Sequence, residues 1–327
     1  MPNNHSNKNV LLFCPSFFGY DKSIKQEIEA LGAKVSLFDE RPFKSFIGKS
    51  ILRLNLSWLI KKHIENYFKK IIYPQISDLD FLVFVNPESI PSSLIKEIKL
   101  LNKDIKVITY MWDSFLNKKN AKQLINVSDS FFTFDPKDAK QYNVSFLPLF
   151  YVSEYEEIRT KKGNKYDFSF VGTAHSDRYE ILKKITSGNM NVFSFLYTPN
   201  KLVFLYKKYF CNELVGLSLK GVSSTSMSRE EVIDVISDSR VVIDINHPSQ
   251  VGLTIRTIET LAAGKKLITT NKEIKDYDFY NEDNILYYHS ETTVNDVSKF
   301  IEQPFSDCCD KYKEFSLKNW VKKVLYE

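Results

Sequence analysis

The feature that most constrains the fold is an alternation of buried-strand and helical patterns along the chain. Short continuous apolar runs are separated by segments in which apolar residues recur at helical spacing. A parallel strand covered on both faces requires such a run, and a helix provides the crossover to the next strand. The first half therefore predicts a doubly wound parallel sheet. Its expected strands are 10–14, 34–38, 81–85, 106–110 and 130–134, with helices at 22–31 and 92–101.

The same alternation restarts after a charged stretch at 151–165, which we interpret as a linker between two domains. A length of 327 residues suits two domains of ordinary size. The predicted domains are 1–155 and 156–308, both Rossmann-like α/β units, and we expect their sheets to face a cleft. The second half has expected strands at 167–171, 191–196, 240–245, 266–269 and 285–288. Its expected helices are 176–186, one opened by Ser228 with Glu231 in a capping box, 254–263 stopped by Gly264, 294–302 and 309–325.

Composition excludes several classes of protein. Hydrophobic residues make up 43% of the chain and charged residues 26%, as in an ordinary globular protein, and the net charge is +5. This mild excess of positive charge suits contact with a nucleotide diphosphate or a membrane surface, and the alternative is simply a lysine-rich, solvated surface. It is far below the positive charge of a dedicated nucleic-acid binder. We expect no signal peptide and no membrane span, and therefore a cytoplasmic protein with reduced thiols. The cysteines, whose spacing matches no zinc motif, are Cys14, Cys211, Cys308 and Cys309.

The stretch 43–76 interrupts the strand–helix rhythm with one or two helical patterns that are rich in lysine and also carry Trp58, Tyr67 and Phe68. A basic amphipathic helix with aromatic residues is a candidate for peripheral contact with the inner face of the cell membrane. The alternative is an ordinary crossover helix that packs its apolar face on the sheet.

The loop and helix at 250–264 are the most specific candidate for chemistry. Ligands of doubly wound sheets bind where loops and helix N-termini follow the carboxyl ends of the strands. Gly252 permits close approach of the backbone, and Arg256 and Glu259 share one helix face. Arg256 can meet a diphosphate and Glu259 the ribose hydroxyls, or the two form a surface ion pair. The residues expected to bind this nucleotide-diphosphate ligand, the donor of a transferred group, are His247, Gly252, Leu253, Thr254, Arg256 and Glu259.

A second candidate is the turn from Gly172 to Arg178, which joins a buried strand to a helix. Such a turn presents backbone N–H groups at the positive end of a helix dipole. Gly172, Thr173 and Arg178 are expected to contact the donor, and His175 is a second cationic partner for phosphate and a candidate catalytic residue. The alternative is a plain turn capped by Ser176 or Asp177.

In the first half, carboxylates and aromatic residues follow the expected strands. Asp113 is the candidate general base for a sugar hydroxyl, and Asp135 is a candidate acceptor-binding residue. The alternative for each is a capping role in a turn or helix. The loop after the first strand is expected to form an aromatic platform for the acceptor sugar, or else to be buried in the core. Its residues are Phe17, Phe18, Gly19 and Tyr20.

The sequence favours metal-independent chemistry without a cofactor. The histidines are far apart and lack ligand spacing, and no Asp-x-Asp pair of the metal-dependent sugar transferases is evident. The histidines are His5, His63, His175, His247 and His289.

The segment 234–271, with its NHPSQ loop and GLTIRTIETLAAG helix, resembles the donor-binding region of GT-B glycosyltransferases. It is most similar to the CgeB-like and lipopolysaccharide-biosynthesis proteins of that superfamily. The segment DFSFVGTAHSDRYEIL resembles the opening strand, turn and helix of the same domain. The resemblance implies that Glu259 holds the donor ribose, that Arg256 and the Gly172–Arg178 turn cradle the diphosphate, and that helices at 309–327 brace the first domain.

The resemblance implies transfer of a sugar from a nucleotide donor, with UDP favoured and GDP the alternative, to a polysaccharide or lipid-linked acceptor in cell-surface glycan synthesis. Many retaining members carry a second glutamate eight positions earlier, where this chain has Val251. The stereochemical outcome is therefore open. The competing interpretations are a nucleotide-sugar epimerase, a solute receptor and a non-catalytic partner in a polysaccharide assembly complex.

Overall fold

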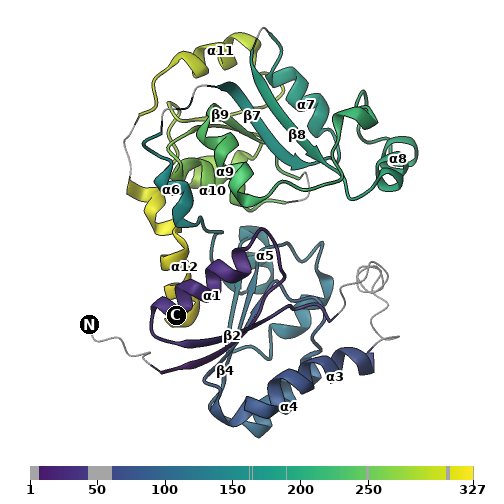
Figure 1. Cartoon of the computed structure of the whole chain (residues 1–327), viewed down its shortest axis with the longest axis vertical. Helices are drawn as coiled ribbons and strands as arrows, with labels where there is room; N and C mark the ends of the chain where they lie inside the picture. The colour runs from purple at the N-terminus through teal and green to yellow at the C-terminus, as the bar shows by residue number, and fades with distance from the viewer. Residues whose placement is uncertain are drawn as a thin grey trace. The chain divides into compact units, whose positions relative to one another are not determined.

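The computed structural model describes residues 7–42, 61–161, 163, 165–188, 190–247, 250–306 and 310–326. The chain divides into two compact units. Unit 1 comprises Met1–Leu149 and Leu317–Glu327, and unit 2 comprises Phe150–Ser316 (Figure 1). The division thus falls slightly before the boundary expected at 155, and the end of the chain belongs to unit 1.

Unit 1 contains a parallel sheet of six strands in the order β2-β1-β3-β4-β5-β6. Apolar residues alternate in direction along β1, so that Leu11 and Phe13 contribute to the core on one face. The stacked rings of Phe13 and Phe84 lie 5.3 Å apart there. The strands are β1 Asn9–Phe13, β2 Lys34–Phe38, β3 Phe81–Val85, β4 Lys106–Met111, β5 Ser130–Thr133 and β6 Ser145–Phe146.

Helices cover both faces of this sheet. The face with Phe13 and Phe84 packs against α3 and α4, and the opposite face, which carries Tyr110, packs against α12. The helices are α1 Tyr20–Ala30, α3 Lys61–Ile72, α4 Ser92–Leu101, α5 Pro136–Tyr142 and α12 Leu317–Tyr326, with 3-10 segments at Tyr73–Asp78 and Lys119–Leu124.

Unit 2 contains a parallel sheet of five strands in the order β11-β10-β9-β7-β8. The strands are β7 Tyr166–Thr173, β8 Val192–Tyr197, β9 Ser239–Asp244, β10 Lys266–Thr269 and β11 Ile285–Tyr287. The helices are α6 Ser153–Glu157, α7 Arg178–Ile185, α8 Lys201–Phe210, α9 Arg229–Ser237, α10 Ile255–Ala262 and α11 Val294–Glu302, with 3-10 segments at Leu219–Gly221, Lys272–Asp276 and Asp310–Phe315. The fold class of two doubly wound parallel sheets is therefore confirmed.

The expected linker at 151–165 is wrong for its first half, which is an integral part of unit 2. Tyr151, Tyr155 and Ile158 are all buried, and the last two lie at a spacing that places them on one side of a helical turn. The charged residues between them conceal this apolar stripe in the sequence.

The single helix expected at 309–325 is also wrong. The structure has a 3-10 segment at Asp310–Phe315 in unit 2 and then α12 in unit 1. Ser316 lies between the two segments and forms a β-bridge with Tyr151. This extended pairing interrupts the helix at the point where the chain leaves unit 2.

The described part of the stretch 43–76 includes α3, which is a crossover helix that packs its apolar face on the sheet rather than a free amphipathic helix. Ile64, Phe68 and Ile72 of α3 are buried against the sheet. The membrane-surface prediction for 43–60 falls outside the described residues. No helix among the described residues is both long enough and apolar enough to span a bilayer.

Candidate functional site

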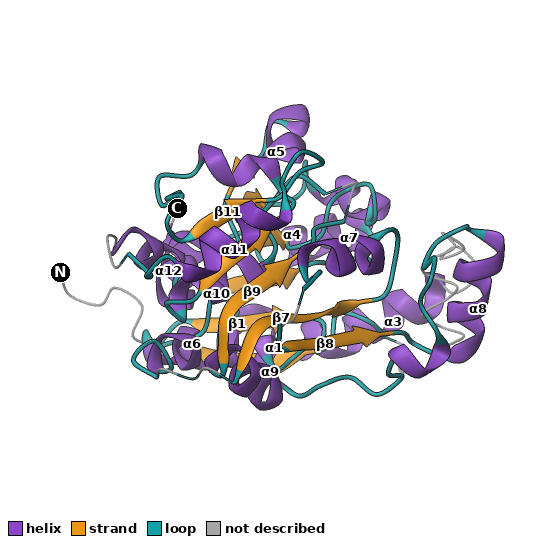
Figure 2. Ribbon diagram, turned by 90° about the horizontal axis from the view of Figure 1, so that it is seen from above, coloured by secondary structure: helices purple, strands orange, loops and turns teal. Residues whose placement is uncertain are grey.

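In unit 2 the predicted donor residues follow the neighbouring strands β7 and β9 at their carboxyl ends. β7 leads into the turn 172–178 and then α7, and β9 leads through a loop into α10 (Figure 2). Because the strands are parallel, both connections leave the same edge of the sheet.

The start of α10 is anchored by Asp244, the last residue of β9. Its buried carboxylate oxygen Oδ2 accepts hydrogen bonds from the hydroxyls of Thr254 and Thr257, each at 2.6 Å. Thr254 is also the N-cap of α10, and its hydroxyl accepts from the Thr257 backbone N–H at 3.2 Å. Thr254 therefore caps the start of α10, and Asp244 fixes the position of that start.

The loop between β9 and α10 is held through its carbonyl groups. The Asn271 side-chain amide donates to the carbonyl oxygens of Val251 at 3.0 Å and Gly252 at 3.3 Å. Asn246 donates to the Gln250 carbonyl at 3.2 Å. The Leu253 side chain lies in the core, so only the backbone of this predicted donor residue can meet a ligand.

The turn after β7 positions Arg178. Its Nη1 donates to the Thr173 carbonyl at 3.1 Å, and the guanidinium lies 5.9 Å from the centroid of the Phe170 ring. Burial lowers the pKa of Arg178 to about 10, so the group stays cationic near neutral pH. Its Nε is buried and has no hydrogen-bond partner within the described part of the chain. A half-buried cation whose buried Nε donor is unused can bind an anion.

Gly172 is required by this packing. A Cβ atom at this position would lie 2.9 Å from Cζ of Phe170 and 3.2 Å from Nη1 of Arg178. The glycine therefore leaves room for the guanidinium beside the strand end.

His175 and His247 bring the two connections together. Their ring centroids lie 4.7 Å apart, one ring from the β7 turn and the other from the β9 loop. Burial, with the nearby charges of Arg178, His247 and Lys207, lowers the pKa of His175 to about 3. His175 is therefore neutral near pH 7, which differs from the cationic phosphate partner expected from the sequence.

Arg256 and Glu259 share one face of α10, as their spacing predicts, and form an ion pair at 2.8 Å. The pair does not lie freely on the surface, because Arg256 is half-buried and Glu259 is fully covered. The Tyr155 hydroxyl of α6 lies 3.5 Å from Nη1 of Arg256, and burial raises the pKa of this tyrosine. A ribose would have to displace Arg256 to reach the Glu259 carboxylate.

In unit 1 the four residues of the predicted aromatic platform have different environments. Phe17 is 50% exposed, and its ring centroid lies 4.8 Å from that of Phe18 and 6.5 Å from that of Trp112. Tyr20 is instead buried in the core. Gly19 has a φ of 72° and is the N-cap of α1, which explains the glycine there. Trp112 was not predicted, although its place directly after a strand could have identified it.

The two candidate carboxylates have different environments. Asp113 follows Trp112 and is half-buried, and its Oδ1 accepts from the Ser114 N–H at 3.0 Å and the Asn117 side chain at 2.8 Å. Asp135 is buried and is the N-cap of α5, where it accepts from the N–H groups of Lys137 and Asp138. The structure thus favours the capping alternative for Asp135.

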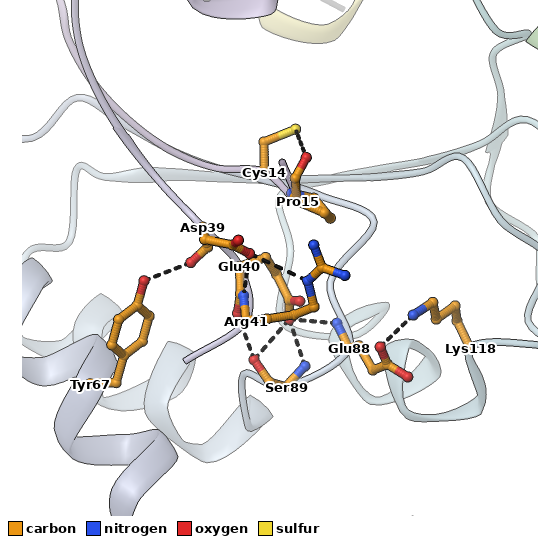
Figure 3. Close-up of polar contacts among 9 residues, drawn as sticks. All are labelled: Cys14, Pro15, Asp39, Glu40, Arg41, Tyr67, Glu88, Ser89 and Lys118. Carbon is orange, nitrogen blue, oxygen red and sulfur yellow. Dashed lines mark hydrogen bonds and ion pairs between the residues drawn. The ribbon is translucent and has the colours of Figure 1, made fainter. Parts of the chain in front are cut away.

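The sequence analysis did not identify Glu40, which follows the carboxyl end of β2 (Figure 3). Asp113 and Asp135 follow the carboxyl ends of β4 and β5 in the same parallel sheet. Glu40 is fully buried, and its Oε1 accepts from the N–H groups of Glu88 and Ser89, each at 2.6 Å, and from the Ser89 hydroxyl at 2.9 Å. Its Oε2 is also buried, without a hydrogen-bond partner among the described residues. Burial raises the pKa of Glu40 from its ordinary 4.5 to about 7. Its position after a strand was the available signal.

Within the described residues, no group of three or more histidine, cysteine, aspartate or glutamate side chains could hold a metal ion. The side chains described above at the unit 2 strand ends include those of arginine, histidine, threonine and acidic residues.

No protein-family model matches the sequence, and no curated protein matches it significantly. Solved structures do match along almost the whole chain. A glycosyltransferase from Rickettsia africae ESF-5 has a TM-score of 0.59 at 11% identity and covers 98% of this chain and 97% of its own. The lipopolysaccharide outer core galactosyltransferase WaaB has a TM-score of 0.54 at 12% identity, with 97% and 99% covered. Anabaena Alr3699/HepE in complex with UDP-glucose has a TM-score of 0.55 at 11% identity, with 97% and 95% covered. The chain therefore has the GT-B fold of these glycosyltransferases.

Proposed function

We propose that this chain is a glycosyltransferase that takes a sugar from a nucleotide-diphosphate donor, with UDP-sugar as the favoured class and GDP-sugar as the alternative. The observation that carries the proposal is the half-buried Arg178, whose buried Nε has no partner among the described residues, on the turn after β7 of a GT-B fold. The similarity to a structure solved with UDP-glucose supports the choice of donor.

In this mechanism unit 2 binds the leaving group. Arg178 and the backbone N–H groups of the α10 start stabilise the diphosphate, whose negative charge develops as the glycosidic bond breaks. A bound diphosphate also favours the protonated form of His175, since a nearby anion raises the pKa of an imidazole. Arg256 would turn from Glu259 toward the phosphates, and this would open Glu259 to the ribose hydroxyls.

Unit 1 would bind the acceptor, for which we propose a polysaccharide or lipid-linked oligosaccharide of cell-surface glycan synthesis. The similarity to WaaB supports this class of acceptor. We assign the sugar contact to the exposed Phe17 ring and the half-buried Trp112 ring beside it, and Asp113 follows Trp112 directly. If the enzyme inverts, Asp113 is the proposed base, because the fully covered Glu40 cannot reach a substrate in this conformation.

The test is a thermal-shift series with UDP, GDP, CMP, CDP and dTDP on the wild-type protein and on Arg178→Gln. A ligand that binds only the native state stabilises it, by about 2.7 kcal/mol at a concentration about 100-fold above Kd. We expect one diphosphate to raise the midpoint of the wild type, and Arg178→Gln to lose most of that rise.

Arg240→Gln is the matched control, since Arg240 belongs to unit 2 but pairs with Asp167 on the surface. It should keep the full shift. A wild type that no nucleotide stabilises would contradict the proposal and favour the non-catalytic interpretation. Release of an epimerised sugar nucleotide in the absence of acceptor would favour the epimerase instead.

A further inference from the structure

An exposed apolar surface in unit 2 has no role in the site described above. Within 201–221, which covers α8 and the segment after it, large apolar side chains are exposed to solvent. They are Leu202, Tyr206, Tyr209, Phe210, Val215 and Leu219. These residues are six of the 13 exposed large apolar residues of the described chain, so exposure is concentrated here. We call this set the α8 patch.

Helix α8 differs from an ordinary surface helix because it exposes apolar residues on its outward face. Leu202, Tyr206 and Tyr209 lie at i, i+4 and i+7, on the outward face, with 77%, 60% and 71% of each residue exposed. Phe210 is 81% exposed, and its ring stacks on Tyr206 at 5.8 Å. Only Phe204 is buried on the inner face. Figures 1 and 2 show α8 at the outer end of unit 2, beyond the sheet and away from α10.

Two lysines of α8 make contacts on its inner side. Lys207 donates to the Ala174 carbonyl at 3.3 Å, and Lys208 donates to the Leu217 carbonyl at 2.6 Å. These contacts hold the helix with its aromatic residues outward. The outward orientation is therefore built into the fold of unit 2.

The positive charge of the segment 201–221 restricts the kind of surface that the α8 patch can contact. It carries Lys201, Lys207, Lys208 and Lys220 against a single carboxylate, Glu213. Glu213 accepts from the Ser176 N–H at 2.8 Å and lies 3.7 Å from Lys207. Lys201 and Lys220 are exposed beside the apolar residues. Aromatic and aliphatic residues flanked by free lysines, with no exposed acid, suit a surface that is both apolar and anionic.

We infer that the α8 patch docks the protein on an anionic lipid bilayer, with the aromatic residues at the boundary between headgroups and acyl chains. Tyrosine and phenylalanine bury apolar area there, and Lys201 and Lys220 meet the anionic headgroups. This contact differs from the 43–76 stretch considered from the sequence. It also stands independently of the donor site, because vesicle binding requires no nucleotide.

The test is co-sedimentation of the full-length protein with phosphatidylcholine vesicles that contain or lack phosphatidylglycerol. We expect the wild type to bind the vesicles that contain phosphatidylglycerol. The double variant Tyr209→Ser with Phe210→Ser should lower the partition coefficient by about tenfold or more. The matched control is Leu100→Ser with Leu101→Ser, which removes two apolar residues of α4 in unit 1 that are also exposed, at 77% and 59%, and should bind as the wild type does.

A second variant, Lys201→Glu with Lys220→Glu, tests the charge without removing apolar residues. It should lower binding to the anionic vesicles, and it keeps the inference testable if the aromatic double variant fails to fold in a thermal melt. Three outcomes would overturn the inference: no binding of the wild type to anionic vesicles, equal binding by folded variants and wild type, or self-association through the patch without vesicle binding. Loss of nucleotide binding in the thermal-shift test would leave this result unaffected.

Discussion

Glu40 shows how burial alone changes the chemistry of a residue. Three donors converge on one oxygen of its carboxyl group, while the other oxygen is buried. Removing the carboxylate from water costs more than these hydrogen bonds recover, and the pKa rises from 4.5 to about 7. Glu40 therefore binds a proton more tightly in the folded protein than in the unfolded chain.

This raised pKa predicts a pH-dependent stability. The contribution of Glu40 is fully present below about pH 4.5 and is lost as the pH rises through about 7, because the folded state then has to give up its proton. Relative to Glu40→Gln, the free energy of unfolding of the wild type should fall by up to about 3 kcal/mol between pH 5 and pH 8.

Urea unfolding at several pH values measures this difference. Glu29→Gln, on the exposed surface of α1, is the control and should track the wild type at every pH. A difference between the wild type and Glu40→Gln that does not change with pH would refute the raised pKa.

At the scale of the element, α10 is fixed at both ends. Asp244 holds its first turn through two hydroxyls, and Arg159 donates to the carbonyls of Leu261 at 3.1 Å and Ala262 at 3.4 Å in its last turn. Beyond that turn, Gly264 adopts a φ of 63° and the chain closes a Schellman motif. A helix so constrained can hold Arg256 and its own N-terminus in place for a ligand.

Gly264→Ala should lower the free energy of unfolding by about 1–2 kcal/mol. The added Cβ would lie 2.8 Å from Cγ of Arg159, and a left-handed conformation disfavours any side chain. Equilibrium urea unfolding monitored by circular dichroism gives the loss. Gly221→Ala is the matched control, because its nearest contact is the movable Leu217 side chain at 3.0 Å. Equal losses in the two variants would contradict the proposed role of the backbone conformation.

At the scale of the whole molecule, unit 1 is built from two separate segments of the chain, one before and one after unit 2. α12 follows all of unit 2 in sequence, yet its residues Trp320, Val321 and Val324 are buried in unit 1. The Trp320 ring lies edge-to-face on Tyr110 of β4 at 4.7 Å. The folding of unit 1 therefore depends on residues that are synthesised after unit 2.

Trp320→Ala should destabilise unit 1 by about 3–5 kcal/mol, as expected for loss of a buried aromatic side chain. Native-state hydrogen exchange should accelerate in β4 and α1 while the strands of unit 2 keep their protection. Phe300→Ala, in α11 of unit 2, should give the reverse pattern. Faster exchange in unit 2 after Trp320→Ala would show that the helix does not belong to unit 1 alone.

The sequence by itself determined the two sheets, most strands and the ends of several helices. Apolar periodicity and capping chemistry are local, so β3, α4 and the capping box at Ser228 follow from short stretches of residues. The same local sequence patterns indicated the loops after β7 and β9 as candidate ligand sites, because helix N-termini and backbone N–H groups become available at strand ends. The shared face of Arg256 and Glu259 was predictable from their spacing alone.

Only the tertiary structure decided which of these residues are covered and what they touch. The burial of Glu259 and Glu40 and the neutral state of His175 depend on segments far away in the sequence. The outward face of α8 and the membership of Tyr155 in unit 2 were hidden for the same reason. Desolvation and pairing are set by neighbours from every packed element, whereas periodicity records only the neighbours along the chain.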